Sequence, residues 1–152
     1  MFEYLLSVIV GIIPFLLYMA FVKHTKTQPV PVSGEIRENV PVKGVLLVRN
    51  DLNMGKGKIV AQAMHAAYSA ANKKSLLSSA WKHCGFKKVS LKVETEQEMD
   101  TLVEKAHSKG IPCSPVIDAG RTQVEPNTHT VTFIGPWYED ELNEITGHLR
   151  LL

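Results

Sequence analysis

The chain has 152 residues, of which 45% are hydrophobic and 21% are charged, and its formal net charge is +2. This length allows one ordinary domain with an appended segment, and the composition excludes a largely disordered chain. The two cysteines, Cys84 and Cys113, have no CxxC spacing and are too few for a disulfide framework. Such cysteine usage is typical of a reducing compartment.

The first element in chain order is an uncharged run of 19 residues, YLLSVIVGIIPFLLYMAFV, from Tyr4 to Val22. A helix needs about 20 residues to cross a bilayer core. A cleaved signal peptide is the alternative, but no basic residue precedes the run and no clean A-x-A site follows it. Lys23 and Lys26 come next, so the positive-inside rule places the rest of the chain in the cytosol. We therefore predict a transmembrane anchor over residues 1–22.

Residues 23–42 form the next segment, KHTKTQPVPVSGEIRENVPV. Pro29, Pro31 and Pro41 disfavour a helix, and the segment has no apolar periodicity. We predict a flexible linker that lets the following domain move near the membrane surface.

Residues 43–152 predict a single α/β domain. The apolar run in KGVLLVRN (43–50) is typical of a strand buried on both faces. Helices are predicted from about Gly57 to Asn72 and over residues 75–85, where Gly85 is the stop signal. The alternating segment KKVSLKVE (87–94) predicts a half-buried strand.

In the second half of this domain, Thr95 and Glu98 predict a capping box at the start of a helix that ends at Gly110. Two short strands are predicted in CSPVID (113–118) and TVTFIG (130–135), and a last helix in EDELNEITGHL (139–149). This order of elements predicts a mixed sheet with helices packed against it.

The charge is unevenly distributed along the domain. Residues 43–92 contain ten Lys or Arg residues and one acidic residue, whereas residues 93–152 contain four and eleven. A basic region of this kind is suited to a phosphate backbone, and ordinary surface solvation is the alternative.

The first predicted helix begins at two lysines among glycines and then carries no charged residue up to residue 72. On a helical wheel, one narrow polar stripe contains Lys58, Gln62, His65 and Ser69. The broad apolar face contains Val60, Ala63, Met64, Ala67, Tyr68 and Ala71. Because neutral polar groups and alanines replace the usual exposed charges, we expect a ligand to approach the stripe closely, beside the anion-binding helix N-terminus. The alternative is a half-buried helix whose Gln and His bind neighbouring backbone.

Common motifs for phosphate and metal binding are absent from the sequence. Gly57-Lys58 lacks the Ser or Thr and the first glycine of a P-loop. The loop from Asp51 has no EF-hand pattern, and the six histidines have no paired spacing that suggests zinc. Asp118 ends a predicted strand before Gly120, where α/β sheets usually bind ligands, although Asp is also a common turn former.

Three separated segments, RNDLNMGKGKIVAQAMHAA, DAGRTQVEPNTHTVTFIGP and ITGHLRLL, closely resemble the peptidyl-tRNA hydrolase 2 family of archaea and eukaryotes. The resemblance spans about Lys43 to Leu152 and departs from the family at Trp137-Tyr138. A hydrophobic segment before the domain is similar to that of the membrane-anchored eukaryotic members. Such members imply a mitochondrial outer membrane facing the cytosol, with the endoplasmic reticulum as the alternative.

The resemblance implies a mixed four-stranded sheet flanked by helices, often in a homodimer, with no metal or other cofactor. It implies hydrolysis of the ester between peptide and tRNA in peptidyl-tRNA, which recycles tRNA from aborted translation. The implied catalytic positions are Lys56, Asp118, Thr122 and Thr130, and the implied supporting positions are Lys58, Gln62, His65 and Arg121. From the charge pattern, we add Lys87 and Lys88 as residues that bind the tRNA backbone.

The residue types fit ester hydrolysis. Asp118 can act as a base or orient a water, Lys56 can stabilise negative charge, and the two threonines can position water or substrate. No Ser-His-Asp or Cys-His arrangement is evident, so we expect direct attack by water, with the proton acceptor left open. A membrane-tethered interaction or signalling adaptor that keeps the fold is the alternative, and an RNA-binding module without catalysis is a third hypothesis.

Overall fold

The structure is a computed structural model that describes residues 37, 40–73 and 75–152. The predicted anchor, and all of the predicted linker except residues 37 and 40–42, lie outside the described residues. Within the described ranges, no helix has both the length and the apolar character needed to cross a membrane.

The described chain alternates strands and helices in a single order. The elements are β1 (Val42–Arg49), α2 (Lys56–Asn72), α3 (Ser78–His83), β2 (Lys88–Val93), α4 (Glu96–Ser108), β3 (Cys113–Asp118), β4 (Thr128–Tyr138) and α5 (Glu139–Thr146). The predicted α/β fold with a mixed four-stranded sheet flanked by helices is confirmed.

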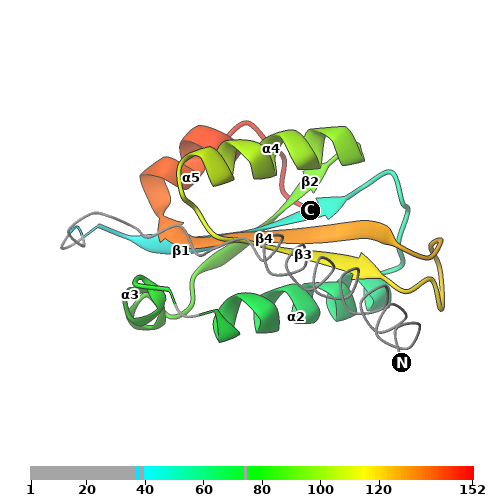
Figure 1. Cartoon of the computed structure of the whole chain (residues 1–152), viewed down its shortest axis with the longest axis horizontal. Helices are drawn as coiled ribbons and strands as arrows, with labels where there is room; N and C mark the ends of the chain where they lie inside the picture. Colours follow the sequence, from blue (N-terminus) through cyan, green and yellow to red (C-terminus); the bar gives the residue numbers. More distant parts are fainter. Residues whose placement is uncertain (1–36, 38–39, 74) are drawn as a thin grey trace, which may run out of the picture. The chain divides into compact units, whose positions relative to one another are not determined.

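The strands of the sheet lie in the order β2-β1-β4-β3. β1 is parallel to β2 and antiparallel to β4, and β3 is antiparallel to β4. β1 and β3 therefore run in the same direction and end at the same edge of the sheet. Helices α2 and α3 cover one face of the sheet, and α4 and α5 cover the other (Figure 1). Because β1 lies in the centre between two helical layers, all eight of its residues are buried, as its continuous apolar run predicts.

Helix α2 packs on the sheet through a different face from the one that the sequence predicts. Its buried residues are Gln62, Ala66 and Ala70. The large residues of the predicted apolar face, Val60, Met64 and Tyr68, are 56%, 62% and 73% exposed. The prediction that these three side chains form the core contact is therefore wrong. Small alanines allow a closer approach to the sheet, and the buried amide of Gln62 is satisfied by partners on β3 and β4.

Strand β4 is longer than predicted at both ends, since it continues from the predicted 130–135 to Thr128 and Tyr138. Trp137 and Tyr138, where the sequence departs from the family pattern, are buried, with 5% and 7% of their surface exposed. Before β1, the guanidinium of Arg37 lies 3.8 Å from the ring centroid of Tyr138. It also forms an ion pair with Asp140 at 3.1 Å, so this part of the predicted linker contacts the domain.

Candidate active site

Except for Lys87 and Lys88, the predicted site residues lie on elements that meet at the edge of the sheet where β1 and β3 end. Asp118 is the last residue of β3, and α2 begins seven residues after the end of β1. Thr130 lies near the start of β4, and Thr122 lies in the loop between β3 and β4. Ligand sites of α/β proteins usually lie at such an edge, outside the carboxyl ends of parallel strands.

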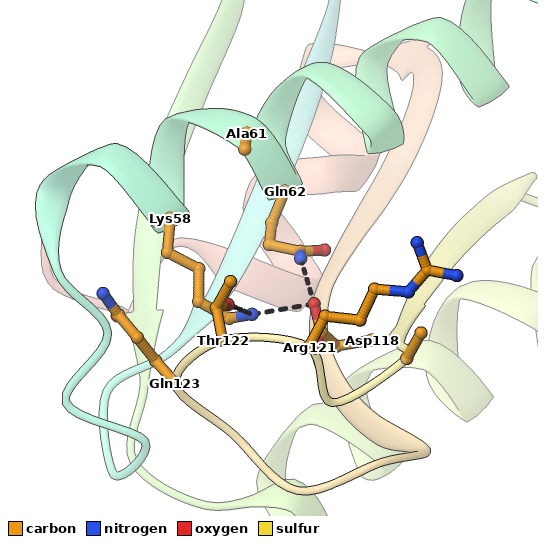
Figure 2. A pocket seen from close by; sticks show the side chains of 8 residues that line it. Lys58, Ala61, Gln62, Asp118, Arg121, Thr122 and Gln123 are labelled. Carbon is orange, nitrogen blue, oxygen red and sulfur yellow. Dashed lines mark hydrogen bonds and ion pairs between the residues drawn. The ribbon is translucent and has the colours of Figure 1, made fainter.

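Two side chains of α2 hold the carboxylate of Asp118. Lys58 Nζ donates to Asp118 Oδ2 at 2.8 Å, and Gln62 Nε2 donates to the same oxygen at 2.6 Å (Figure 2). These residues are four apart on α2 and therefore lie on the same side of the helix. The polar stripe of α2 thus faces β3, and one helix orients both donors.

The backbone after β3 holds the other oxygen of this carboxylate. The N–H of Gly120 donates to Asp118 Oδ1 at 2.8 Å. Gly120 has a φ of +74°, and a Cβ there would lie 2.4 Å from the backbone nitrogen of Pro126. Only glycine fits this turn without displacing the loop, so the turn that fixes Asp118 depends on Gly120.

The surroundings of Asp118 favour its ionised form. The hydrogen bond from Lys58 is the largest cause that lowers the pKa of Asp118 below its ordinary value, followed by the bond from the Gly120 N–H. The side chains of Lys58 and Asp118 are only 7% and 12% exposed. The pair is therefore shielded from most of the solvent, although both residues line a pocket.

The two threonines occupy different places. Lys58 Nζ donates to Thr122 Oγ1 at 2.9 Å, and Thr122 lines the pocket together with Lys58 and Asp118. Thr130 is fully buried. Its hydroxyl lies 3.2 Å from both Gln62 Oε1 and the carbonyl oxygen of Val116. Thr130 therefore acts on the site through the orientation of Gln62.

The structure does not bring every predicted site residue to Asp118. Lys56 is the exposed first residue of α2, and no described side-chain contact joins it to Asp118. Figure 2 shows the guanidinium of Arg121 pointing away from Lys58. His65 is exposed and lines a second pocket beside the first. The prediction that Lys56 is catalytic therefore rests on its sequence position alone, whereas Lys58 is the lysine that contacts the Asp118 carboxylate.

Lys87 and Lys88 lie at the opposite end of the sheet. Lys88 pairs with Gly44 near the start of β1, whereas Asp118 pairs with Thr128 beyond the other end of that strand. The separation along the strands is roughly 20 Å at about 3.3 Å per residue. Lys87 Nζ forms an ion pair with Glu139 at 2.6 Å. Contact between these lysines and tRNA stays a prediction, and it concerns a surface distant from Asp118.

One polar residue of the first pocket, Gln123, was not predicted from the sequence. Gln123 Oε1 accepts a hydrogen bond from the N–H of Gly55 at 2.9 Å and so ties the loop after β3 to the start of α2. Gln123 lies in one of the segments that carry the family resemblance, but no periodicity marks it, and its contact with Gly55 is evident only in the folded arrangement. The described residues contain no group of three or more His, Cys, Asp or Glu side chains that could hold a metal ion.

Comparison with known proteins gives the family. The family model described as "Peptidyl-tRNA hydrolase PTH2" matches residues 42–152. The chain is 47% identical over 115 residues to a peptidyl-tRNA hydrolase of Methanocaldococcus jannaschii. The aligned region covers 73% of this chain and 100% of that protein. It is 39% identical over 134 residues to the bovine (Bos taurus) "Peptidyl-tRNA hydrolase 2, mitochondrial", covering 86% of this chain and 75% of that protein. The chain therefore belongs to the peptidyl-tRNA hydrolase PTH2 family.

Proposed function

We propose that the chain hydrolyses the ester bond between the peptide and the 3′ ribose of peptidyl-tRNA by direct attack of water, and so recycles tRNA from aborted translation. The observation that carries this proposal is the ionised Asp118 carboxylate, held by Lys58 and Gln62 in an open pocket of a chain from this family. The pocket places a negative group, a cation and a hydroxyl around one point, which is what ester hydrolysis by water needs.

Asp118 orients the attacking water in this mechanism. Its carboxylate accepts hydrogen bonds from Lys58, Gln62 and Gly120, and an ionised carboxylate has about four acceptor positions. One position is left for a water. Because its pKa is lowered, Asp118 is a weak base at neutral pH, and efficient general bases have a pKa near the working pH. We therefore assign it to water orientation and leave proton uptake to another group.

Lys58 and Thr122 stabilise the negative charge that develops on the substrate. The ammonium of Lys58 has three N–H donors, of which two bind Asp118 and Thr122. The third donor is left for the carbonyl oxygen or the departing 3′ oxygen. Since Thr122 accepts from Lys58, its own O–H can also donate to the substrate. Preorganised donors of this kind act on the transition state more than on the ground state.

The tRNA binds to the basic side of the domain in this proposal. Lys56 is exposed at the N-terminus of α2, where free backbone N–H groups and the helix dipole favour a phosphate. Lys87 and Lys88 extend the basic surface roughly 20 Å further at the strand spacing of about 3.3 Å per residue. A tRNA is long enough to contact both places at once, so these lysines contribute to affinity and not to chemistry.

The location in the cell rests on the N-terminal run and on a relative. Residues 4–22 have the length and hydropathy of a membrane span, and the bovine relative is named mitochondrial. We infer a membrane anchor that keeps the hydrolase domain in the cytosol, at the mitochondrial outer membrane, with the endoplasmic reticulum as the alternative. A homodimer stays a prediction that sedimentation of the purified chain tests.

The function is tested by incubating the purified full-length chain with peptidyl-tRNA and separating its products. We expect deacylated tRNA and a free peptide, both formed much more slowly by the Asp118→Asn variant. Binding of tRNA with an intact ester would support the RNA-binding module instead. If the chain neither binds nor cleaves peptidyl-tRNA, the result would support the adaptor.

A further inference from the structure

A second pocket continues from the one at Lys58. It lies between α2 and β3 and shares Gln62, Asp118, Ala119 and Arg121 with the first pocket. Beyond these shared residues its lining consists of His65, Ser69, Pro115, Val116 and Ile117. We call these five residues the α2–β3 groove. Because the two pockets share Asp118, a molecule whose reacting bond lies at Asp118 can extend from it into the groove.

Charge differs between the two directions that lead away from Asp118. The first pocket contains Lys58, and the α2 N-terminus with Lys56 lies at that end of the helix. The α2–β3 groove contains no Lys, Arg, Asp or Glu, and the charged residues Asp118 and Arg121 are among those that it shares with the first pocket. A phosphate backbone is bound by cations. Among the residues that line only one of the two pockets, the single cation is Lys58 in the first pocket, so the groove favours the uncharged part of the substrate.

The groove has the form of a binding site for an extended peptide. β3 is an edge strand, so one side of its backbone faces no other strand in the described part of the chain. Such an edge can accept a peptide as an additional strand. Pro115 has no N–H, so the peptide must bind to the other backbone groups of β3. Ile117 is 54% exposed and offers an apolar contact next to the reacting end.

A contact between the end of α2 and the start of β3 lies beyond the groove. One turn beyond Ser69, Lys73 Nζ donates to the carbonyl oxygen of Cys113 at 2.5 Å, and so joins α2 to β3. From Gln62 to Ser69 the helix rises about 10 Å at about 1.5 Å per residue. An extended chain covers this length with about three residues.

We propose that the α2–β3 groove binds the peptide part of peptidyl-tRNA, with the C-terminal residue of the peptide beside Asp118 and about two further residues running toward Ser69. This inference rests on the proposed function, and it assigns the two sides of the site: RNA at the α2 N-terminus and peptide along β3. The enzyme therefore recognises the peptide through its length and backbone, for roughly three residues.

The test compares substrates that share one tRNA and one C-terminal amino acid. The full-length chain is given the N-acetyl-aminoacyl-tRNA and peptidyl-tRNAs with two, three and six residues, and kcat/KM is measured for each. We expect kcat/KM to rise by about tenfold up to three residues, the effect of roughly two buried methylene groups, and then to stay constant. A kcat/KM that is the same for all four substrates would overturn the proposal.

Two neighbouring residues on α2 give a matched pair of variants. Ser69→Arg obstructs the groove, whereas Tyr68→Arg introduces the same side chain at a position that is 73% exposed and outside the lining. Because every substrate carries the same tRNA, the ratio of kcat/KM between long and short substrates cancels any effect of the added charge on RNA. We expect this ratio to fall close to one in Ser69→Arg and to be kept in Tyr68→Arg.

Thermal melting of both variants controls for folding, and Ile117→Asp tests the groove from the opposite wall. An unchanged ratio in folded Ser69→Arg and Ile117→Asp proteins would overturn the proposal. Weaker inhibition by deacylated tRNA in these variants would assign the groove to RNA and overturn it as well. Failure of the unsubstituted chain to hydrolyse any of the four substrates would contradict the proposed function itself.

Discussion

Lys58 and Asp118 form an ion pair, with 2.8 Å between Nζ and Oδ2, that joins the first turn of α2 to the end of β3. An exposed pair of this kind contributes little to stability, because solvent screens it. This pair is mostly shielded, with side chains 7% and 12% exposed. It fixes the position of a cation and a carboxylate in one pocket, so substitution of either residue changes the environment of the other.

Asp118→Asn separates chemistry from binding. Asn has nearly the same shape and can still accept a hydrogen bond from Lys58, but it lacks the negative charge that orients and polarises a water. We expect kcat and kcat/KM to fall together by roughly 10²–10⁴-fold, while tRNA affinity is kept. Single-turnover cleavage and a tRNA-binding titration measure the two effects.

Asp140→Asn is the matched control for this substitution. Asp140 lies at the start of α5, is 57% exposed and pairs with Arg37. Removal of its charge should therefore leave the pocket at Asp118 intact. If a folded Asp118→Asn protein cleaves as fast as the unsubstituted protein, the Asp118 carboxylate has no part in the mechanism, and His65 becomes the next candidate.

Lys58→Met and Lys56→Met distinguish the two lysines at the start of α2. Lys58 contacts both Asp118 and Thr122, so its loss should lower kcat by roughly 10²–10³-fold, the cost of removing one transition-state donor. Lys56 is exposed at the helix N-terminus, and its loss should raise KM more than it lowers kcat. Steady-state kinetics on both variants measures this difference. The reverse result would assign the catalytic cation to Lys56.

The lowered pKa of Asp118 predicts the acid side of the pH profile. Because folding lowers this pKa below 3.8, the ionised group contributes stability above its unfolded pKa, and that contribution is lost as pH falls through the folded pKa. Protonation of Asp118 should therefore cause no loss of hydrolysis between pH 8 and pH 5. In Lys58→Met the pKa should rise, and protonation should occur at higher pH. An NMR titration of the carboxyl carbon measures both values. A midpoint above 3.8 in the unsubstituted protein would contradict this account.

Binding of tRNA should weaken steeply with salt, because each neutralised phosphate releases counterions. Replacing both Lys87 and Lys88 by Gln should raise KM and reduce the salt slope by about one for each lost phosphate contact. Since these residues lie at the far end of the sheet from Asp118, kcat should stay unchanged. Lys105→Gln on α4 is the control. Affinity that depends neither on salt nor on the double substitution would show that this surface does not bind the backbone.

Residues 1–42 should be sufficient to attach a protein to a membrane. Fusion of this segment to a fluorescent protein should give a membrane-bound reporter that proteases added to the cytosolic side can digest. Removal of residues 4–22 from the fusion is the control and should give a diffuse signal. A diffuse or secreted reporter from the intact segment would refute the anchor.

Local signals predicted most of the fold because they depend on neighbours in the sequence. The run Val45–Val48 predicted a strand buried on both faces, and Thr95 was predicted to cap α4. The side chain of Thr95 does accept from the N–H of Glu98. The reciprocal half of the capping box differs, because the Glu98 carboxylate accepts from the N–H of Glu94.

The orientation of α2 could not be predicted from periodicity. The apolar periodicity placed Met64 and Tyr68 on the apolar face and Gln62 on the polar stripe, but contact with the sheet depends on side-chain size and on the partners that β3 and β4 offer. For the same reason, the resemblance gave Lys56 as the catalytic lysine and Lys58 as a supporting residue, whereas in the structure Lys58 contacts Asp118. The two side chains point about 160° apart on a helix of about 100° per residue, and the position of β3 decides which of them reaches Asp118.

The central pair of the sheet also governs how the protein is made. β1 pairs with β4. The middle of the sheet can therefore form only after residues 128–138 have been synthesised, long after residues 42–49. Pairing over such a sequence distance slows folding. Until then β1 can pair with β2 on one side, but its other side stays unpaired during synthesis. A ribosome that stalls before β4 emerges therefore holds a chain with an open apolar strand.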